Sequence, residues 1–187
     1  DLLCGIHKLN GGPKVDGTCD DLYGVSETFS VSRAVSDYRA VPNDTTANFR
    51  MGYTEQALYI FIEVKDSFMH ESDSVFCLID EKRYAEELSQ VTNIELQRNG
   101  AVTVSDGDGN PLSNAEVVVK DSAQGYTAEI RMQWRIRTSF AQYEGFGFDC
   151  YVFDNRDSKD FKSLLAWNDC HASYDYRKAG EMYFMDK

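Results

Sequence analysis

Short runs rich in β-branched and aromatic residues recur along the chain, separated by clusters of Gly, Asn, Asp and Ser. Runs of this kind predict strands and turns. The segment Arg83–Leu88 has helical character, but it is long enough only for a turn of helix within a connection. The pattern therefore predicts an all-β fold, a two-sheet antiparallel β-sandwich of jelly-roll-like type with about eleven strands. The predicted strands are Thr28–Arg33, Phe49–Tyr53, Leu58–Val64, Val75–Asp80, Thr92–Arg98, Ala101–Ser105, Glu116–Lys120, Tyr126–Trp134, Phe146–Asp154, Leu164–Asn168 and Met182–Met185.

The hydrophobic pattern also indicates how deeply individual strands are buried. Apolar and polar residues alternate through Tyr126–Trp134, which predicts one core face and one solvated face. Leu58–Val64 and Val75–Ile79 are almost continuously apolar, which is typical of central strands covered on both faces. The sequence Arg98-Asn99-Gly100 predicts a type I′ hairpin between its two flanking strands.

Length and charge limit the classes of protein to consider. The 187 residues suit one domain, 1–187, whose first 14 residues we expect to form a loop segment. The formal net charge is −12, so nucleic acid and anionic membrane surfaces are not expected as partners. No stretch of about 18 apolar residues is present, so we expect no membrane span.

The five cysteines favour disulfide chemistry over a structural zinc site, because no C-x-x-C pair and no zinc-finger spacing occurs. Cys4 and Cys19 bracket a Gly-rich segment that a disulfide between them would tie down, whereas Cys77 lies in an apolar run and is expected in the core. The chain begins at Asp1, which suggests a processed or excised segment. We expect a secreted protein, extracellular or at the cell surface.

Catalytic motifs are missing from the sequence, which contains no G-x-S-x-G, no H-E-x-x-H and no catalytic-cysteine signature. We therefore do not expect an enzyme. Asp106, Asp108 and Asn110 alternate like the start of a calcium loop, but Val117 stands where the bidentate Glu belongs, so a hairpin from Ala101–Ser105 to Glu116–Lys120 is favoured.

A second acidic cluster, at Asp16, Asp20 and Asp21, could cap the chain before the first predicted strand or hold calcium. Structural calcium is therefore a candidate cofactor. The residues proposed as its ligands are Asp16, Asp20, Asp106 and Asp108.

Aromatic residues near the C-terminus suggest another kind of chemistry. Trp167, Tyr174 and Tyr176 interleave with amide, carboxylate and guanidinium side chains in a turn-rich stretch. Sugar-binding sites pair exposed rings with such polar groups, because sugars present flat C–H faces ringed by hydroxyls. Core packing is the competing explanation for an aromatic-rich segment.

Five segments in order resemble the family 9 carbohydrate-binding modules. Val15–Tyr23 resembles the family's I-D-G-x-x-D-x-x-W opening. The other four resemble its strand unit ending in V-K-D, its D-S-V motif with a later Asp, its G-Y-x-x-E strand, and its closing V-x-D and S-W-x-D pattern. These four are Phe49–Asp66, Asp73–Asp80, Gly125–Trp134, and Gly145–Asp154 with Leu165–Asn168.

The resemblance implies a non-catalytic sandwich that binds a poly- or oligosaccharide as part of a larger secreted polysaccharide-active enzyme or surface protein, often with structural calcium. Family members clamp a sugar between two tryptophans, whose positions fall here at His70 and near Tyr174. Three polar positions of the family site are also changed, to Phe76, Glu95 and Tyr151. The resulting candidate ligand-binding set is Tyr174, Tyr151, His70, Tyr176, Glu95, Gln97 and Asn168.

Two alternatives remain open at this point. The rewritten site is compatible with a structural or protein-interaction domain on the same sandwich that has lost sugar binding. Related sandwiches also carry haem on His and Met ligands, and Met69 and His70 are adjacent, although neighbouring side chains of a strand point to opposite faces.

Overall fold

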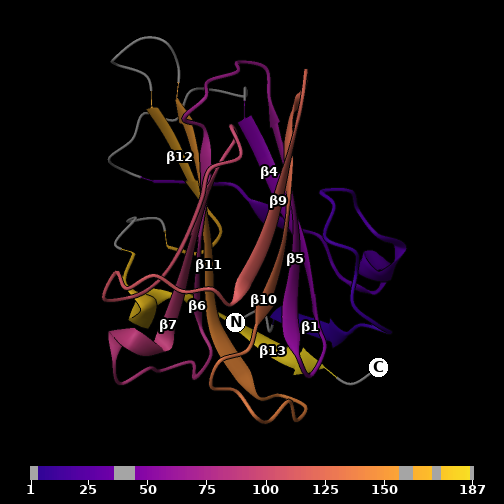
Figure 1. The fold of residues 1–187 in the computed structure, drawn as a ribbon, viewed down its shortest axis with the longest axis vertical. Coiled ribbons are helices and arrows are strands. Elements are labelled where there is room, and N and C mark those ends of the chain that lie inside the picture. The colour runs from indigo at the N-terminus through magenta and orange to yellow at the C-terminus, as the bar shows by residue number, and fades with distance from the viewer. Residues whose placement is uncertain (1–3, 36–44, 156–161, 170–173, 186–187) are drawn as a thin grey trace.

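The structure is a computed structural model that describes residues 4–35, 45–155, 162–169 and 174–185. Over these ranges the chain forms thirteen strands and three short 3-10 helices, which confirms the all-β prediction (Figure 1). None of the helices described there is long and apolar enough to cross a membrane. The strands are β1 (Cys4–Lys8), β2 (Phe29–Val31), β3 (Arg33–Ala34), β4 (Thr45–Tyr53), β5 (Ala57–Asp66), β6 (Ser74–Asp80), β7 (Val91–Gln97), β8 (Val102–Asp106), β9 (Ala115–Ser122), β10 (Gly125–Gln133), β11 (Gly145–Asn155), β12 (Lys162–Ala166) and β13 (Gly180–Met185), and the helices are η1 (Asp21–Val25), η2 (Leu88–Gln90) and η3 (Tyr176–Lys178).

The strands follow one hydrogen-bonded path, β8-β7-β6-β11-β13-β1-β4-β5-β10-β9, which folds over into two layers. Figure 1 shows the layer of β6, β7, β11 and β12 beside the layer of β4, β5, β9 and β10. The strand β12 pairs with β11 and β3, and β2 pairs with β4. Because β13 and β1 join the two layers by hydrogen bonds, the sandwich is closed along one side.

The N-terminal segment differs from the expected loop, because Cys4–Lys8 forms β1. This strand runs parallel to β13 on one side and to β4 on the other. Its one large apolar side chain, Ile6, is fully buried in the core. A five-residue strand with a single core anchor has too weak a periodicity to stand out in the sequence, and its partners are distant along the chain.

The core lies between the two layers and is rich in aromatic rings. Phe49 and Phe148 meet there at 5.2 Å between centroids. Trp167 packs edge-on against Phe49 at 5.9 Å, so it is a partly buried residue that packs against the core and not the exposed platform that the sequence suggested. Each large side chain buried in this way contributes roughly 1.5–3 kcal/mol to folding through the removal of apolar surface from water.

The outer face of β5 and β10 is covered by the segment that follows β1. Leu9 and Tyr23 pack there on Ala57, Tyr59 and Phe61, which confirms the predicted burial of β5 on both faces. The predicted alternation holds for the inward residues of β10, which are buried in the core. Its outward residues are not all exposed to solvent.

Glu129, on the outward side of β10, is fully buried beneath this covering segment. Its carboxylate accepts hydrogen bonds from the backbone N–H groups of Asp16 at 2.9 Å and Gly17 at 3.1 Å, and from the hydroxyl of Tyr23 at 3.1 Å. Burial raises the pKa of this carboxyl, while the three donors act in the opposite direction. Glu129 therefore fastens the N-terminal segment to the sheet.

Three local predictions need correction. The hairpin between β7 and β8 forms, but of its turn residues Gly100 has a positive φ (92°) and Asn99 does not, so the turn is not type I′. No helical turn forms over residues 83–88, because Arg83 takes a positive φ of 71°, and the 3-10 turn begins at Leu88.

The expected hairpin from Ala101–Ser105 to Glu116–Lys120 is also wrong. The strand β8 pairs with β7, while β9 pairs with β10, so the two strands lie at opposite ends of the hydrogen-bonded path. The chain between them crosses from one layer to the other.

The disulfide that Cys4 and Cys19 could have formed around the Gly-rich segment is not present in the structure. Cys4 lies in β1, whereas Cys19 lies in the covering segment, with its sulfur 3.9 Å from the carbonyl oxygen of Asp20. The core position predicted for Cys77 is confirmed, and this residue faces Cys150 across β6 and β11. Cys170 lies outside the described residues.

Candidate functional site

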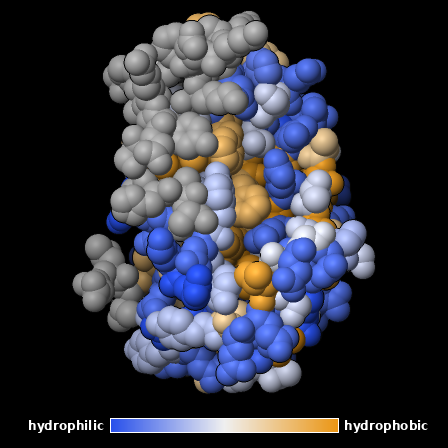
Figure 2. Space-filling model, turned by 90° about the vertical axis from the view of Figure 1, so that its left-hand side faces the viewer, coloured by the Kyte–Doolittle hydropathy of each residue, from blue (hydrophilic) through white to orange (hydrophobic). Residues whose placement is uncertain are grey.

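The outer face of β6, β7 and β11 carries a row of aromatic side chains. Val75, Cys77 and Val152 point into the core, so the residues that alternate with them point outward. The register aligns Phe76 with Glu95 on β7 and with Tyr151 on β11. Figure 2, which looks onto this side of the molecule, shows apolar side chains gathered in the middle of the face and hydrophilic ones around them.

Tyr174 lies over this row, after the chain has returned from β12. Its ring centroid is 4.8 Å from that of Tyr151, 5.3 Å from that of Phe76 and 6.5 Å from that of Phe153. Its φ of 49° is in the left-handed region, a conformation that costs energy for a residue other than glycine. The residue nevertheless remains 39% exposed, so it presents apolar surface to solvent.

A surface cavity of about 240 Å³ lies against Tyr174 and is lined by Phe76, Glu95, Phe153 and Tyr174. We call it the Tyr174 cavity. Three of its four lining residues are aromatic, and the fourth supplies a carboxylate. The cavity is smaller than the roughly 300–1,000 Å³ typical of sites for drug-sized ligands, so it suits a small ring or one end of a longer ligand.

Tyr151 forms the floor beneath Tyr174 and is only 1% exposed. Its hydroxyl donates to the buried carboxylates of Asp149 and Asp169, at 3.4 and 3.3 Å. Burial raises the pKa of the Tyr151 hydroxyl, and the two neighbouring carboxylates raise it further. Tyr151 is therefore a neutral donor that holds the aromatic floor in place.

Asp149 links this floor to the chain that leads towards Tyr174. Its carboxylate accepts backbone hydrogen bonds from Cys150 at 2.8 Å, Asn168 at 3.0 Å and Asp169 at 2.9 Å. Burial nevertheless raises the pKa of Asp149 to about 6, because the penalty for a desolvated charge outweighs these three donors.

Three of the residues proposed from the sequence come together at this site. Tyr174 and Glu95 line the cavity, and Tyr151 supports Tyr174 from below. Because it is buried, Tyr151 acts as a support for a platform and not as a platform itself. Gln97 lies two residues along β7 from Glu95, opposite Ser74, and its side-chain oxygen accepts a hydrogen bond from Asn99.

The remaining three lie elsewhere. His70 lines a separate cavity of about 230 Å³, and its Nδ1 accepts a hydrogen bond from the backbone N–H of Ser72. The Nδ2 of Asn168 donates to the carbonyl oxygen of Lys178 at 2.9 Å. Tyr176 packs beside the cluster formed by Leu78, Ala85 and Val91.

Within the part of the chain that the structure describes, His70 and Tyr174 line two different cavities, whereas a two-sided clamp requires both rings to face one cavity. Met69, the other residue of the haem hypothesis, is 57% exposed on the same loop as His70.

Sequence reasoning missed Phe76 and Phe153 as lining residues of the site. Both sit at outward positions of strands whose inward neighbours are buried. A large aromatic side chain on the outward face of a strand was the available signal, because such a position is usually polar.

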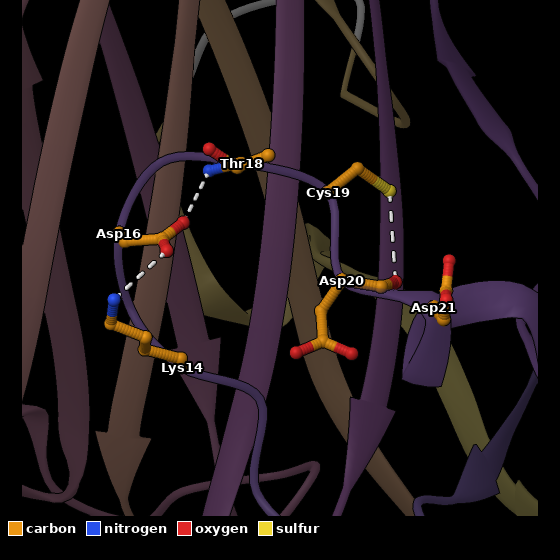
Figure 3. Close-up of a pocket in the computed structure, with 6 residues that line it drawn as sticks. All are labelled: Lys14, Asp16, Thr18, Cys19, Asp20 and Asp21. Atoms are coloured by element: carbon orange, nitrogen blue, oxygen red, sulfur yellow. Dashed lines mark hydrogen bonds and ion pairs between the residues drawn. The ribbon is translucent and has the colours of Figure 1, made fainter.

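Of the four acidic residues proposed as calcium ligands, three have carboxylates with a local partner, namely Asp16, Asp20 and Asp106. In the surface cavity of Figure 3, Asp16 accepts from the backbone N–H of Thr18 and pairs with Lys14, while the side chains of Asp20 and Asp21 point in other directions. Asp20 caps η1 by accepting from the N–H of Leu22 at 2.9 Å.

The second proposed calcium loop is built around Asp106. Its carboxylate accepts from the backbone N–H groups of Asp108 and Asn110, both at 2.9 Å. Calcium at these positions stays a prediction, but the geometry accounts for both clusters as turns.

Comparison with known proteins adds to this picture. Residues 15–183 match the family model described as carbohydrate family 9 binding domain-like. The chain is 25% identical over 167 residues to endo-1,4-beta-xylanase A of Thermotoga neapolitana and 24% identical over 166 residues to the enzyme of that name from Thermotoga maritima. These alignments cover 85% of this chain but only 16% and 15% of the two xylanases.

Solved structures show the same fold. A family 9 carbohydrate-binding module from Caldicellulosiruptor kristjanssonii in complex with glucose has a TM-score of 0.82 and 21% identity, covering 98% of this chain and 96% of that one. Its complex with cellotriose has a TM-score of 0.80 at 21% identity, covering 98% and 94%. The predicted sandwich architecture is confirmed by this likeness.

Proposed function

The chain belongs to the carbohydrate family 9 binding domain-like family, and from this premise we propose that it is a non-catalytic module that binds a glycan in the Tyr174 cavity. The observation that carries the proposal is the half-exposed ring of Tyr174, held over an aromatic floor and next to the carboxylate of Glu95. Glucose and cellotriose occupy the two similar structures named above, which supports a sugar as the ligand.

The chemistry of the cavity suits one face of a sugar ring. The C–H face of a pyranose stacks on Tyr174, and we expect a contact of this kind to contribute about 0.5–1.5 kcal/mol beyond the area that it buries. The Glu95 carboxylate accepts hydrogen bonds from ring hydroxyls, and a hydrogen bond to a charged group contributes roughly 1.5–3 kcal/mol. Together these two groups fix the orientation of a bound ring.

The context of the module is part of the same proposal. The chain spans about one sixth of the length of the curated relatives that it matches. We propose that it is likewise attached to other domains in a larger polysaccharide-active protein, that its ligand is a poly- or oligosaccharide, and that it acts outside the cell. On this view any catalysis belongs to neighbouring domains.

Affinity electrophoresis on a panel of polysaccharides tests the proposal, followed by calorimetry with glucose and cellotriose as soluble ligands. The parent chain should be retarded by at least one polysaccharide, and Tyr174→Ala should remove most of the retardation. The matched control is Tyr84→Ala, which removes an equally large ring that is 65% exposed and does not line the cavity.

The outcomes separate the alternatives. If His70→Ala and not Tyr174→Ala abolishes binding, the site lies in the cavity lined by His70. If the parent binds no glycan in either assay, the sugar-binding proposal fails, and the same sandwich is better explained as a structural or protein-interaction domain.

A further inference from the structure

Two cysteines face each other inside the core, on the neighbouring strands β6 and β11. The register of these antiparallel strands sets Cys77 directly opposite Cys150. Both residues are 0% exposed and belong to the main core cluster, so their side chains leave the sheet on the same, inward side. In the structure both are thiols. The fold therefore brings together two thiols that are far apart in the sequence, in a place that water does not reach.

The backbone around this pair has the spacing that a cross-strand disulfide needs. The carbonyl oxygen of Cys150 accepts from the backbone N–H of Trp167 at 2.9 Å, and its own N–H donates to the Asp149 carboxylate at 2.8 Å. Neither group is directed at Cys77, so the two cysteines form a non-hydrogen-bonded pair of the ladder. The Cα atoms of such a pair, and also its Cβ atoms, lie about 4.5 Å apart. Disulfides span about 4.4–6.8 Å between Cα atoms and about 3.5–4.5 Å between Cβ atoms, so this pair fits without a large backbone movement.

The two thiol groups already interact in the reduced protein. A hydrogen bond with Cys77 raises the pKa of the Cys150 thiol well above its ordinary value, and burial raises this pKa further. The two sulfurs are therefore close together before any oxidation. The same surroundings suppress the thiolate, which is the form that reacts with disulfides, so the closed core protects both cysteines.

We propose that Cys77 and Cys150 form a disulfide across β6 and β11 when the chain folds in the presence of a disulfide oxidant such as oxidised glutathione. The thiolate of one cysteine attacks the oxidant, forms a mixed disulfide and releases one reduced thiol. The second cysteine then attacks the mixed disulfide and releases the other. Two S–H bonds of the protein are replaced by one S–S bond, and the two electrons and two protons end on the two thiols that leave.

This disulfide lies directly beneath the aromatic floor of the Tyr174 cavity. The next pair along the same two strands is Phe76 and Tyr151, whose rings are 6.1 Å apart between centroids. A covalent link between the adjacent cysteines holds these two residues in register, and it also restricts the unfolded chain. Formation of the bond does not depend on whether the cavity binds a sugar, so the two proposals can fail separately.

The test begins with the unaltered protein, which is reduced, unfolded and refolded either in a glutathione redox buffer or with a reductant alone. The remaining thiols are alkylated in denaturant, and tryptic peptides are identified by mass spectrometry. We expect the peptides that carry Cys77 and Cys150 to be linked to each other after the first treatment and alkylated after the second. Oxidised glutathione added to protein that is already folded and reduced should produce the link at least about tenfold more slowly, because the core hides both thiols.

A variant that keeps only the two core cysteines measures the effect on stability. In Cys4→Ser/Cys19→Ser/Cys170→Ser, Ellman's reagent in denaturant should detect no thiol after oxidative refolding and both thiols after reductive refolding. The oxidised form should melt roughly 5–15 °C above the reduced form, given the usual stabilisation by a disulfide in a chain of this length. The matched control adds Cys77→Ala, which leaves Cys150 without an opposite thiol. Its melting temperature should be the same after either treatment.

Three results overturn the proposal. One is complete alkylation of Cys77 and Cys150 after refolding with oxidised glutathione, which would mean that both stay reduced as small core side chains. Another is a link from either residue to Cys4, Cys19 or Cys170 in the unaltered protein. The third is an oxidised variant that melts below its reduced form, because a bond that strains the native sheet in this way would not form as the chain folds.

Discussion

The exposed ring of Tyr174 rests on the buried ring of Tyr151, with 4.8 Å between centroids and 49° between ring planes. As a residue, Tyr174 is 39% exposed, whereas Tyr151 is 1% exposed. Because Tyr151 is itself held by buried carboxylates, the surface offered to a ligand is positioned from inside the sheet. A site built in this way loses affinity when its support is changed, even if no contact with the ligand is removed.

Tyr151→Ala should therefore weaken glycan binding although the side chain is buried. Loss of a buried aromatic side chain costs about 3–5 kcal/mol of folding free energy, and the resulting cavity lets Tyr174 sink or reorient. Tyr151→Phe keeps the ring and should bind nearly as the parent does. Urea denaturation measures the stability and calorimetry the affinity, at a temperature where both variants are folded. Unchanged affinity in Tyr151→Ala would show that Tyr174 does not need this support.

Glu95→Ala tests the polar side of the cavity. If the carboxylate orients a sugar ring, its removal should cost roughly 1.5–3 kcal/mol of binding free energy, because hydrogen bonds to charged groups are of that size. Folding should be little affected, because Glu95 is exposed. Glu116→Ala is the control, since it removes an exposed carboxylate from β9, which belongs to the other layer. Equal affinities in these two variants and the parent would remove Glu95 from the site.

Glu129→Ala should detach the N-terminal segment from the outer face of β5 and β10. It leaves three donors, two backbone N–H groups and the hydroxyl of Tyr23, without their acceptor, and a buried unsatisfied donor costs about 1–3 kcal/mol. We expect a loss of at least about 2 kcal/mol in folding free energy. The control, Glu63→Ala, breaks only a solvated contact with Lys65 and should cost less than about 1 kcal/mol.

Hydrogen exchange gives a second reading of the same prediction. The amides of residues 16–25 should exchange faster in Glu129→Ala than in the parent, while those of β6 and β11 should not change. Uniform acceleration across the chain would mean that Glu129 stabilises the whole fold and not this segment in particular.

Sequence periodicity was sufficient for most strands because their inward residues repeat at every second position. The strand β10 shows this clearly, with Ala128, Ile130 and Met132 all fully buried. The strand β1 escaped prediction because its place depends on β13 and β4, which lie far along the chain. Pairing with distant partners leaves little local signal.

The site was predictable only in part, for a related reason. Tyr174 and Glu95 could be proposed from composition and resemblance, but the depth of Tyr151 depends on Tyr174 folding back over it. Acidic residues close together in the sequence, such as Asp106 and Asp108, turned out to shape turns. Asp66, Asp73 and Asp154 form a buried cluster that was not recognised in the sequence. The three strand ends that bring these aspartates together are separate in the chain.

Asp149 should make the free energy of unfolding fall as the pH rises, because the pKa of its carboxyl is raised in the folded state. A salt-bridged carboxylate, whose pKa is lowered, has the opposite effect. Burial raises its pKa to about 6, above the ordinary aspartate value of 3.8, so between these values the folded state binds more protons than the unfolded state. The stabilisation from its proton is complete below about pH 4 and is lost as the pH rises through about 6, at up to about 1.4 kcal/mol per pH unit. Glu129 and Asp154 also have raised pKa values and change stability in the same sense, so the parent curve alone cannot isolate Asp149.

Asp149→Asn provides the comparison, because an amide of the same shape does not titrate. It should be less stable than the parent at every pH, since its NH₂ group cannot accept the backbone hydrogen bonds of Asn168 and Asp169 together with that of Cys150. Its stability should nevertheless fall less steeply between about pH 4 and 6, and the difference in slope measures the proton on Asp149. Denaturant unfolding at a series of pH values gives both slopes. Parallel curves would place the pKa of Asp149 in the ordinary range, with its three backbone donors outweighing the cost of burial.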